Sequence, residues 1–316
     1  MHLLIPFASG LSDAANQVLH DLTLPNLSQL LARFAPTLRL GSDATTLTPP
    51  HELAEAAAFG WEAADGCLPF AAAAARADGV EVGDAAWGLI TPAHWHVGRD
   101  HVVLADPGAL QLGAAESRAA FEAVRELFES EGFRLQWGAP ERWYVAHESL
   151  ADWPTASLDR VIGRDVESWS RTAHAPAASA RLIRRLQSEV QLLLYPHPLN
   201  EAREARGAPT LNSFWLSGCG RAQAVREGDA PSLRIDTSLR APLLADDWLA
   251  WADAWRALDA GALAELAAVA QAHQPAALTL CGERHAQRYE ARPPSAWQRL
   301  TQRFTHVAPH TVLEPL

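Results

Sequence analysis

The stretch Tyr195–Gly220 constrains the fold more than any other part of this 316-residue chain. A His-Pro-Leu-Asn turn leads into a short arginine-bearing segment, which is followed by a glycine and then by an apolar run that begins at Leu211. Glycine behind a helical segment and a continuous apolar run are typical of a chain that turns back into a buried strand. The stretch therefore predicts an ordered hinge that re-enters a core.

Short apolar runs alternate with segments of helical periodicity along the chain. The runs His2–Phe7, Ala85–Ile90 and Ala276–Leu280 have the character of buried strands. Helical periodicity is found at His51–Phe59, residues 116–131, Ala178–Tyr195 and Ala245–Ala272. Alternation of this kind predicts an α/β fold with a layered core.

One internal stretch has the elements of a self-contained domain. Between about residues 111 and 206, a helix, two strands around Gly138-Ala139-Pro140 and a second long helix follow one another. This predicts an inserted α+β domain at 111–206 that interrupts a core formed by residues 1–110 and 207–316.

The net charge of −11 argues against non-specific binding to nucleic acid or to an anionic membrane, because both need a positive field. No run of 18 apolar residues occurs, so no membrane span is expected. Cys67, Cys219 and Cys281 are odd in number and not closely paired, as in proteins of reducing compartments. With no signal-peptide pattern at the N-terminus, a cytoplasmic location is expected.

Four segments resemble, in order, motifs of the archaeal-type cofactor-independent phosphoglycerate mutases. They are TLPNLSQLL from Thr23, Leu68–Ile90, HPLNEAREARG from His197 and LNSFWLSGCG from Leu211. That family belongs to the alkaline-phosphatase-like superfamily. The resemblance therefore implies a reduced alkaline-phosphatase-like core around the inserted domain.

The resemblance also implies a serine nucleophile beside two divalent metal ions, which need several Asp and His ligands. Here Phe7-Ala8-Ser9 stands where the family has a metal-binding aspartate, and His51 falls at the nucleophile position. Downstream of Gly220 neither Asp-x-x-Gly-His nor Gly-Asp-His-Ser occurs. The chain thus resembles the ligand-depleted bacterial RpfE-type regulatory proteins, which implies no catalytic residue, no metal and no enzyme activity.

Three histidines are candidate ligand contacts. His51 follows Pro49-Pro50 at the start of a predicted helix, where the positive end of the helix dipole favours an anion; the alternative is an ordinary residue of a packed helix. His94 and His96 point to the same side of an extended segment, a spacing that suits a shared divalent metal. A hydrogen-bonded pair in a cleft is the alternative.

The stretch after Tyr195 supplies the remaining candidates, which are His197, Asn200, Arg203, Arg206 and Asn212. Asn200 is predicted to be a helix N-cap, and Arg203 and Arg206 lie three residues apart on one helix face. The two arginines fit a clamp for an anionic ligand, or else ion pairs with Glu201 and Glu204. Asn212 heads the following buried strand.

These observations predict a regulatory protein that binds an anionic small molecule, or a partner protein, in a cleft between core and inserted domain. Its predicted site residues are His51, His94, His96, His197, Asn200, Arg203, Arg206 and Asn212. Two other functions stay open. One is a metal-dependent phosphomutase or phosphatase whose ligands have moved to the region from His94 to Asp106. The other is an interaction module that has merely inherited the cleft.

Overall fold

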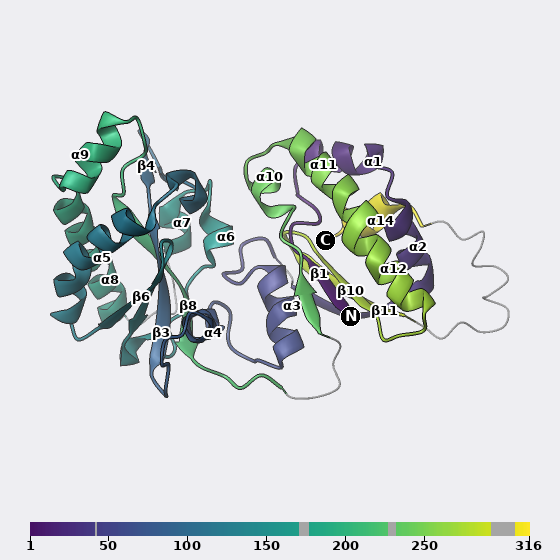
Figure 1. The fold of residues 1–316 in the computed structure, drawn as a ribbon, viewed down its shortest axis with the longest axis horizontal. Coiled ribbons are helices and arrows are strands. Elements are labelled where there is room, and N and C mark those ends of the chain that lie inside the picture. Colours follow the sequence, from purple (N-terminus) through teal and green to yellow (C-terminus); the bar gives the residue numbers. More distant parts are fainter. Residues whose placement is uncertain (42, 171–176, 227–231, 292–306) are drawn as a thin grey trace. The chain divides into compact units, whose positions relative to one another are not determined.

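A computed structural model describes residues 1–41, 43–170, 177–226, 232–291 and 307–316, and these form two compact units (Figure 1). The first unit consists of residues 1–45, 49–60 and 225–316, and the second of residues 46–48 and 61–224. The stretch 111–206, predicted as an inserted domain, lies wholly within the second unit. That unit also takes in residues 61–110 and 207–224.

The first unit is built on a mixed five-stranded sheet with the order β2-β11-β10-β1-β9. Its strands are β1 (His2–Ile5), β2 (Phe34–Gly41), β9 (Leu233–Ile235), β10 (Ala277–Cys281) and β11 (His285–Ala291). β1 pairs in parallel with β9 and β10, and β11 runs antiparallel to β10 and β2. The predicted α/β fold class is confirmed.

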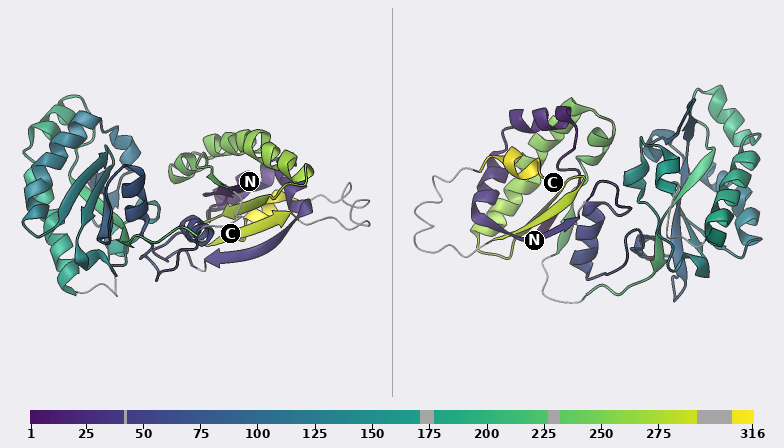
Figure 2. Two further views of the ribbon diagram at one scale, coloured as in Figure 1. Left: turned by 60° about the horizontal axis from the view of Figure 1, so that its bottom comes forward. Right: turned by 180° about the vertical axis from the view of Figure 1, so that it is seen from behind.

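Helices cover both faces of this sheet, because its central strands are apolar on both sides. Leu3 and Ile5 of β1 pack into a core shared with the helices on one face, whereas Leu4 packs towards α3 on the other. Figure 2 shows this layering within the unit. The helices are α1 (Asp13–Asp21), α2 (Pro25–Arg33), α3 (Pro50–Phe59), α10 (Arg240–Leu244), α11 (Trp248–Leu258), the π-helical η3 (Asp259–Leu263), α12 (Ala264–Gln271) and α14 (Pro309–Leu313).

The second unit contains an antiparallel four-stranded sheet with the order β6-β7-β3-β8. Its strands are β3 (Ala86–Ala93), β6 (Arg134–Ala139), β7 (Arg142–Ala146) and β8 (Ser213–Arg221). The predicted hairpin around Gly138-Ala139-Pro140 is confirmed as β6–β7. A separate small ribbon pairs β4 (Trp95–Val97) with β5 (Val102–Leu104).

Helices also flank the sheet of the second unit. α5 (Ala114–Glu129) and α8 (Ala177–Leu194) share one apolar core with the sheet, in which Phe121, Phe128 and Phe214 are buried. α4 (Phe70–Ala77) packs alanines against Trp87 and Tyr144 on the other face. The shorter helices are η1 (Pro107–Leu110), η2 (Glu148–Leu150), α6 (Leu158–Val161), α7 (Val166–Ser170) and α9 (Pro198–Ala205).

None of the helices within the described ranges combines the length and the apolar character that a bilayer crossing requires.

Candidate functional site

The parallel strands of the first unit end at one edge of its sheet, which is where open α/β sheets hold their ligands. Hydrogen bonds connect the segments that follow β1 and β10 at this edge. The Ala8 amide donates to the Cys281 carbonyl at 2.8 Å, and the Leu11 amide donates to Glu283 Oε1 at 3.2 Å. A Cβ on Gly282 would lie 2.2 Å from Ser9 Oγ, so this close approach requires glycine.

Phe7 holds an unusual backbone conformation at this edge. Its φ of 58° lies in the left-handed region, which costs a bulky residue about 1–3 kcal/mol and persists only where the surroundings enforce it. The buried indole of Trp251 enforces it by donating to the Phe7 carbonyl at 3.2 Å. The Phe7 ring is thereby fixed with its centroid 5.2 Å from that of the His51 imidazole.

His51 lies in the first turn of α3, as predicted. The helix begins at Pro50 with Pro49 as its N-cap, and no side chain caps it. Ala54 packs against Leu4 and Cys281 of the sheet, which fixes the helix on strands β1 and β10. The positive end of the α3 dipole therefore lies at the carboxyl edge of the sheet, beside Phe7.

Glu55 follows His51 by one helical turn, so the two side chains share a face of α3. Burial raises the pKa of the Glu55 carboxyl above its ordinary value, and the charge of His51 acts in the opposite direction. A raised pKa moves this carboxyl towards the neutral acid, which lessens its repulsion of an anion beside His51. Sequence reasoning missed Glu55, although its spacing from His51 was visible.

The other seven predicted site residues belong to the second unit. His94 and His96 do lie on one side of the chain, with ring centroids 6.5 Å apart, and His94 Nδ1 lies 2.8 Å from the Thr210 carbonyl. Asn212 bonds to the residue between them: its Oδ1 accepts from the Trp95 amide at 2.7 Å and its Nδ2 donates to the Trp95 carbonyl at 3.0 Å. These three candidates therefore form one cluster.

Few side chains in this region are available to coordinate a metal ion. Asp106 already accepts from the Gly108 amide at 3.0 Å, as the cap of η1. Across the residues that the structure describes, no group of three or more His, Cys, Asp or Glu side chains is arranged to hold a metal ion. The donors of the described residues thus do not fit a two-metal centre, which needs several converging carboxylates and imidazoles.

α9 begins earlier than the sequence predicts. Pro198 is its first residue and His197 its N-cap, with Nδ1 accepting from the Leu199 amide at 3.2 Å. The prediction of Asn200 as N-cap is wrong, because the fixed φ of proline starts the helix two residues before it. Asn200 instead donates to the carbonyls of Leu194 and Leu211, each at 2.8 Å, and fastens the end of α8 to the entry of β8.

Arg203 lies in α9 and Arg206 is its C-cap, and both pair with Glu116 of α5, at 2.8 and 2.5 Å. Arg203 is fully buried; its Nε also donates to the Pro209 carbonyl at 2.6 Å, and its Nη2 donates to the Leu110 carbonyl. The predicted alternative, ion pairs with Glu201 and Glu204, is therefore replaced by a pair to a distant helix. Every nitrogen of the Arg203 guanidinium has a protein partner.

The structure thus separates the predicted set. His51 belongs to the first unit; the second unit holds one cluster around Trp95 and one around Glu116. The polar atoms of Asn200 and Arg203 bond to the protein itself. His51, beside Phe7 and Glu55, is the candidate placed where α/β folds bind ligands.

Comparison with known proteins gives a limited answer. No protein-family model matches the chain, and no curated protein matches it either. A cofactor-independent phosphoglycerate mutase from Thermoplasma acidophilum is similar in structure, with 14% identity and a TM-score of 0.38, over 98% of this chain and 95% of that one. A Pyrococcus horikoshii protein gives 13% identity and a TM-score of 0.46, over 93% and 88% of the two chains. TM-scores this low establish neither a family nor a function.

Proposed function

We propose that this protein is a non-catalytic ligand-binding protein with a regulatory output, and that it holds a small anionic molecule at the start of α3. The observation that carries the proposal is the place of His51. Its imidazole lies at the positive end of α3, against the fixed ring of Phe7, at the carboxyl edge of the parallel strands.

The physical basis is the combination of a helix dipole and a ring donor. A helix N-terminus carries about half a positive charge and stabilises a nearby anion by up to about 2 kcal/mol. An imidazole N–H adds a directional hydrogen bond to a phosphate or carboxylate oxygen. Three carboxyl side chains belong to the same edge, those of Glu52, Glu55 and Glu283. Glu52 and Glu283 disfavour a chain of phosphates, so the proposed ligand carries one compact anionic headgroup.

The lack of catalysis in the proposal rests on the groups at the edge. The hydroxyl of Ser9 lies at this edge and is buried, and the described residues hold no group of three metal donors beside it. His51 occupies the place where the resemblance to phosphoglycerate mutases implies a serine. Without a hydroxyl beside paired metal ions, phosphoryl transfer by that route has no nucleophile.

Thermal unfolding with inorganic phosphate, 3-phosphoglycerate and nucleoside monophosphates tests the binding. We expect one of these to raise the unfolding temperature of the wild type, since a ligand at 100 times its Kd stabilises by about 2.7 kcal/mol. His51→Ala should abolish the rise. His96→Ala, which removes an exposed imidazole from the other unit, is the matched control and should retain it. Loss of the rise in His96→Ala alone would move the site to the histidine pair and refute the proposal.

A turnover assay tests the lack of catalysis separately. The wild type is incubated with 3-phosphoglycerate and Mn²⁺ or Mg²⁺, and the product is followed by ³¹P NMR. We expect no conversion to 2-phosphoglycerate and no release of phosphate. Turnover that survives purification and scales with protein concentration would contradict the non-catalytic assignment, whatever the binding experiment gives.

A further inference from the structure

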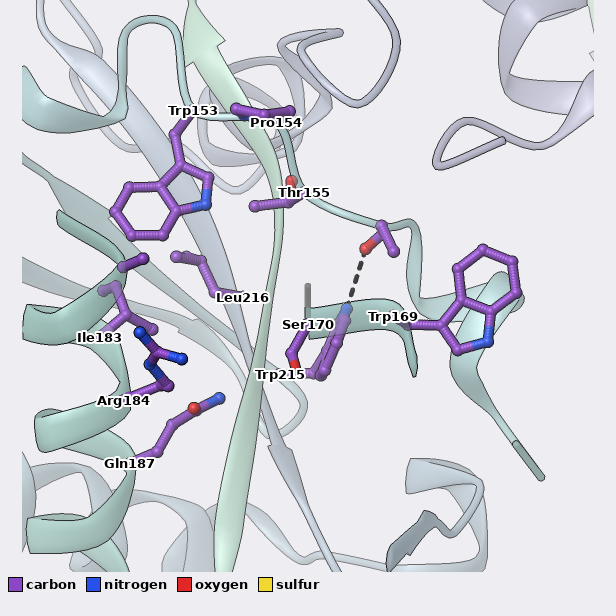
Figure 3. A pocket seen from close by; sticks show the side chains of 12 residues that line it. Trp153, Pro154, Thr155, Trp169, Ser170, Ile183, Arg184, Gln187, Trp215 and Leu216 are labelled. Atoms are coloured by element: carbon purple, nitrogen blue, oxygen red, sulfur yellow. Dashed lines mark hydrogen bonds between the residues drawn. The ribbon is translucent and has the colours of Figure 1, made fainter. Parts of the chain in front are cut away.

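The second unit contains a cavity that none of the predicted site residues lines. It lies between α8, β8, the end of α7 and the chain that follows η2 (Figure 3). The residues that line it include three tryptophans, two large aliphatic side chains and two long polar side chains: Trp153, Trp169, Trp215, Ile183, Leu216, Arg184 and Gln187. An apolar cavity with a few polar groups at its rim is the usual form of a small-molecule site.

The walls of the cavity are firmly held. Trp153 and Ile183 are 5% and 7% exposed and belong to the main apolar core of the unit. The Trp215 indole donates to the Ala156 carbonyl at 2.9 Å, a bond drawn in Figure 3, and this fixes the ring. The Thr155 amide donates to the Gly66 carbonyl at 2.9 Å, and this bond anchors the segment that carries Trp153 and Ala156. The cavity is therefore preformed, which lowers the entropic cost of filling it.

The polar side of the cavity is supplied by α8. Arg184 and Gln187 extend from this helix on the side of the cavity opposite Trp169 (Figure 3). Arg184 is exposed and makes no ion pair with any carboxylate of the described residues. Gln187 Nε2 reaches the Phe214 carbonyl only at 3.5 Å, the outer limit of a hydrogen bond, so its amide can turn to a ligand at small cost.

The size of the cavity restricts which chemical group can enter it. Its volume, about 60 Å³, is several times what one water needs and is below the roughly 150 Å³ of a cavity that takes a benzene ring. The space therefore suits one small apolar group, such as a short branched alkyl chain, with its polar end at the open side. Trp153, Trp215 and Ile183 offer such a group apolar contacts, and burying it against them is worth about 0.8 kcal/mol per CH₂.

We propose that this cavity binds a short branched aliphatic carboxylate. The alkyl group enters between Trp153, Trp215 and Ile183, and the carboxylate lies at the rim on Arg184. A guanidinium matches a carboxylate with two parallel N–H···O bonds, and the Gln187 amide can add a third. Arg184 favours an anion over an amine or an alcohol of the same shape, because its charge has no carboxylate partner among the described side chains.

Isothermal titration with 4-methylpentanoate tests the proposal on the full chain. We expect saturable binding to the wild type, at least about tenfold weaker binding of 4-methylpentan-1-ol, and no detectable binding of acetate. The alcohol has the same tail without the charge, and acetate has the charge without the tail. Equal binding of all three, or no saturation by 4-methylpentanoate at millimolar concentration, would overturn the proposal.

Two substitutions and a control variant locate the binding site. Arg184→Gln should weaken 4-methylpentanoate about tenfold or more, the loss expected for a charge-assisted contact. Arg181→Gln removes an exposed arginine one turn earlier on α8 that does not line the cavity, and should leave binding unchanged. Ala180→Phe, which fills the cavity from α8, should abolish binding while the unfolding midpoint shows that the protein stays folded. An equal loss in Arg181→Gln, or undiminished binding in a folded Ala180→Phe, would refute the assignment.

Discussion

Replacing Arg203 by methionine tests whether its guanidinium holds the second unit together. The change removes three contacts from a fully buried side chain: the ion pair with Glu116 and the hydrogen bonds to the carbonyls of Pro209 and Leu110. Methionine keeps much of the side-chain volume, so the effect reports mainly the lost polar contacts.

The magnitude follows from what is left behind. A buried carbonyl without a donor, here that of Leu110, costs about 1–3 kcal/mol, and breaking a buried ion pair costs about 3–5 kcal/mol; Pro209 is exposed, so water can replace the donor to its carbonyl. Glu116 retains Arg206 at 2.5 Å and is 21% exposed, which reduces its share of the loss. We therefore expect Arg203→Met to lower the free energy of unfolding by about 3–5 kcal/mol.

Urea unfolding followed by far-UV circular dichroism measures this loss. Arg206→Met is the matched control: it removes the other partner of Glu116, but its side chain is 50% exposed, so about 0–1 kcal/mol is expected. A loss below about 1 kcal/mol in Arg203→Met, or equal losses in the two variants, would refute the structural role. The predicted use of Arg203 as a ligand clamp would then be favoured.

Three further predictions follow from buried ionisable groups. Burial, aided by Arg288, lowers the pKa of His2 from 6.5 to about 4. On acidification the unfolded chain therefore takes up this proton first, and the free energy of unfolding should fall by roughly 3 kcal/mol as the pH drops from 6.5 to 4. Urea midpoints across this range measure the fall. If the free energy of unfolding depended on pH as steeply in His2→Gln as in the wild type, the assignment to His2 would be contradicted. Burial raises the pKa of Glu55, so its charged form is disfavoured in the folded state. Glu55→Gln should raise the urea midpoint at a pH above the ordinary range of a glutamate but not below it, and a uniform shift would disprove the cause. Burial also raises the pKa of Cys67 and Cys281, and that of Cys219 to about 12. Only Cys67, the one of the three that is not fully buried, should react slowly with a thiol reagent in the native protein, and modification of Cys219 before unfolding would refute this.

Elements with strong local signals were predictable from the sequence. α5 extends over Ala114–Glu129 against a predicted 116–131, because Phe121, Val124 and Phe128 recur at helical spacing. Two elements with weaker sequence signals, β2 and α4, were not predicted. β2 was missed because only its first two residues are buried, so it shows no apolar alternation. α4 was missed because its run of alanines has no periodicity.

The candidate site was harder to predict because its contacts join distant parts of the chain. The nearness of Arg203 and Arg206 follows from helical spacing, but their partner Glu116 lies about ninety residues earlier, beyond any local pattern. The positive φ of Phe7 has no sequence signal, since an indole far along the chain enforces it. By contrast, the place of His51 in the first turn of a helix could be predicted, because Pro49-Pro50 marks that start locally.

The most direct measurement of the central claim is the response of the His51 ring to an anion. Histidine-labelled protein is titrated with inorganic phosphate and observed by NMR, and His51→Ala identifies the His51 resonance. The account predicts a saturable shift of the His51 resonance, with those of His94 and His96 unchanged. A His51 signal that does not move while the ring signals of His94 and His96 shift with saturation would contradict it.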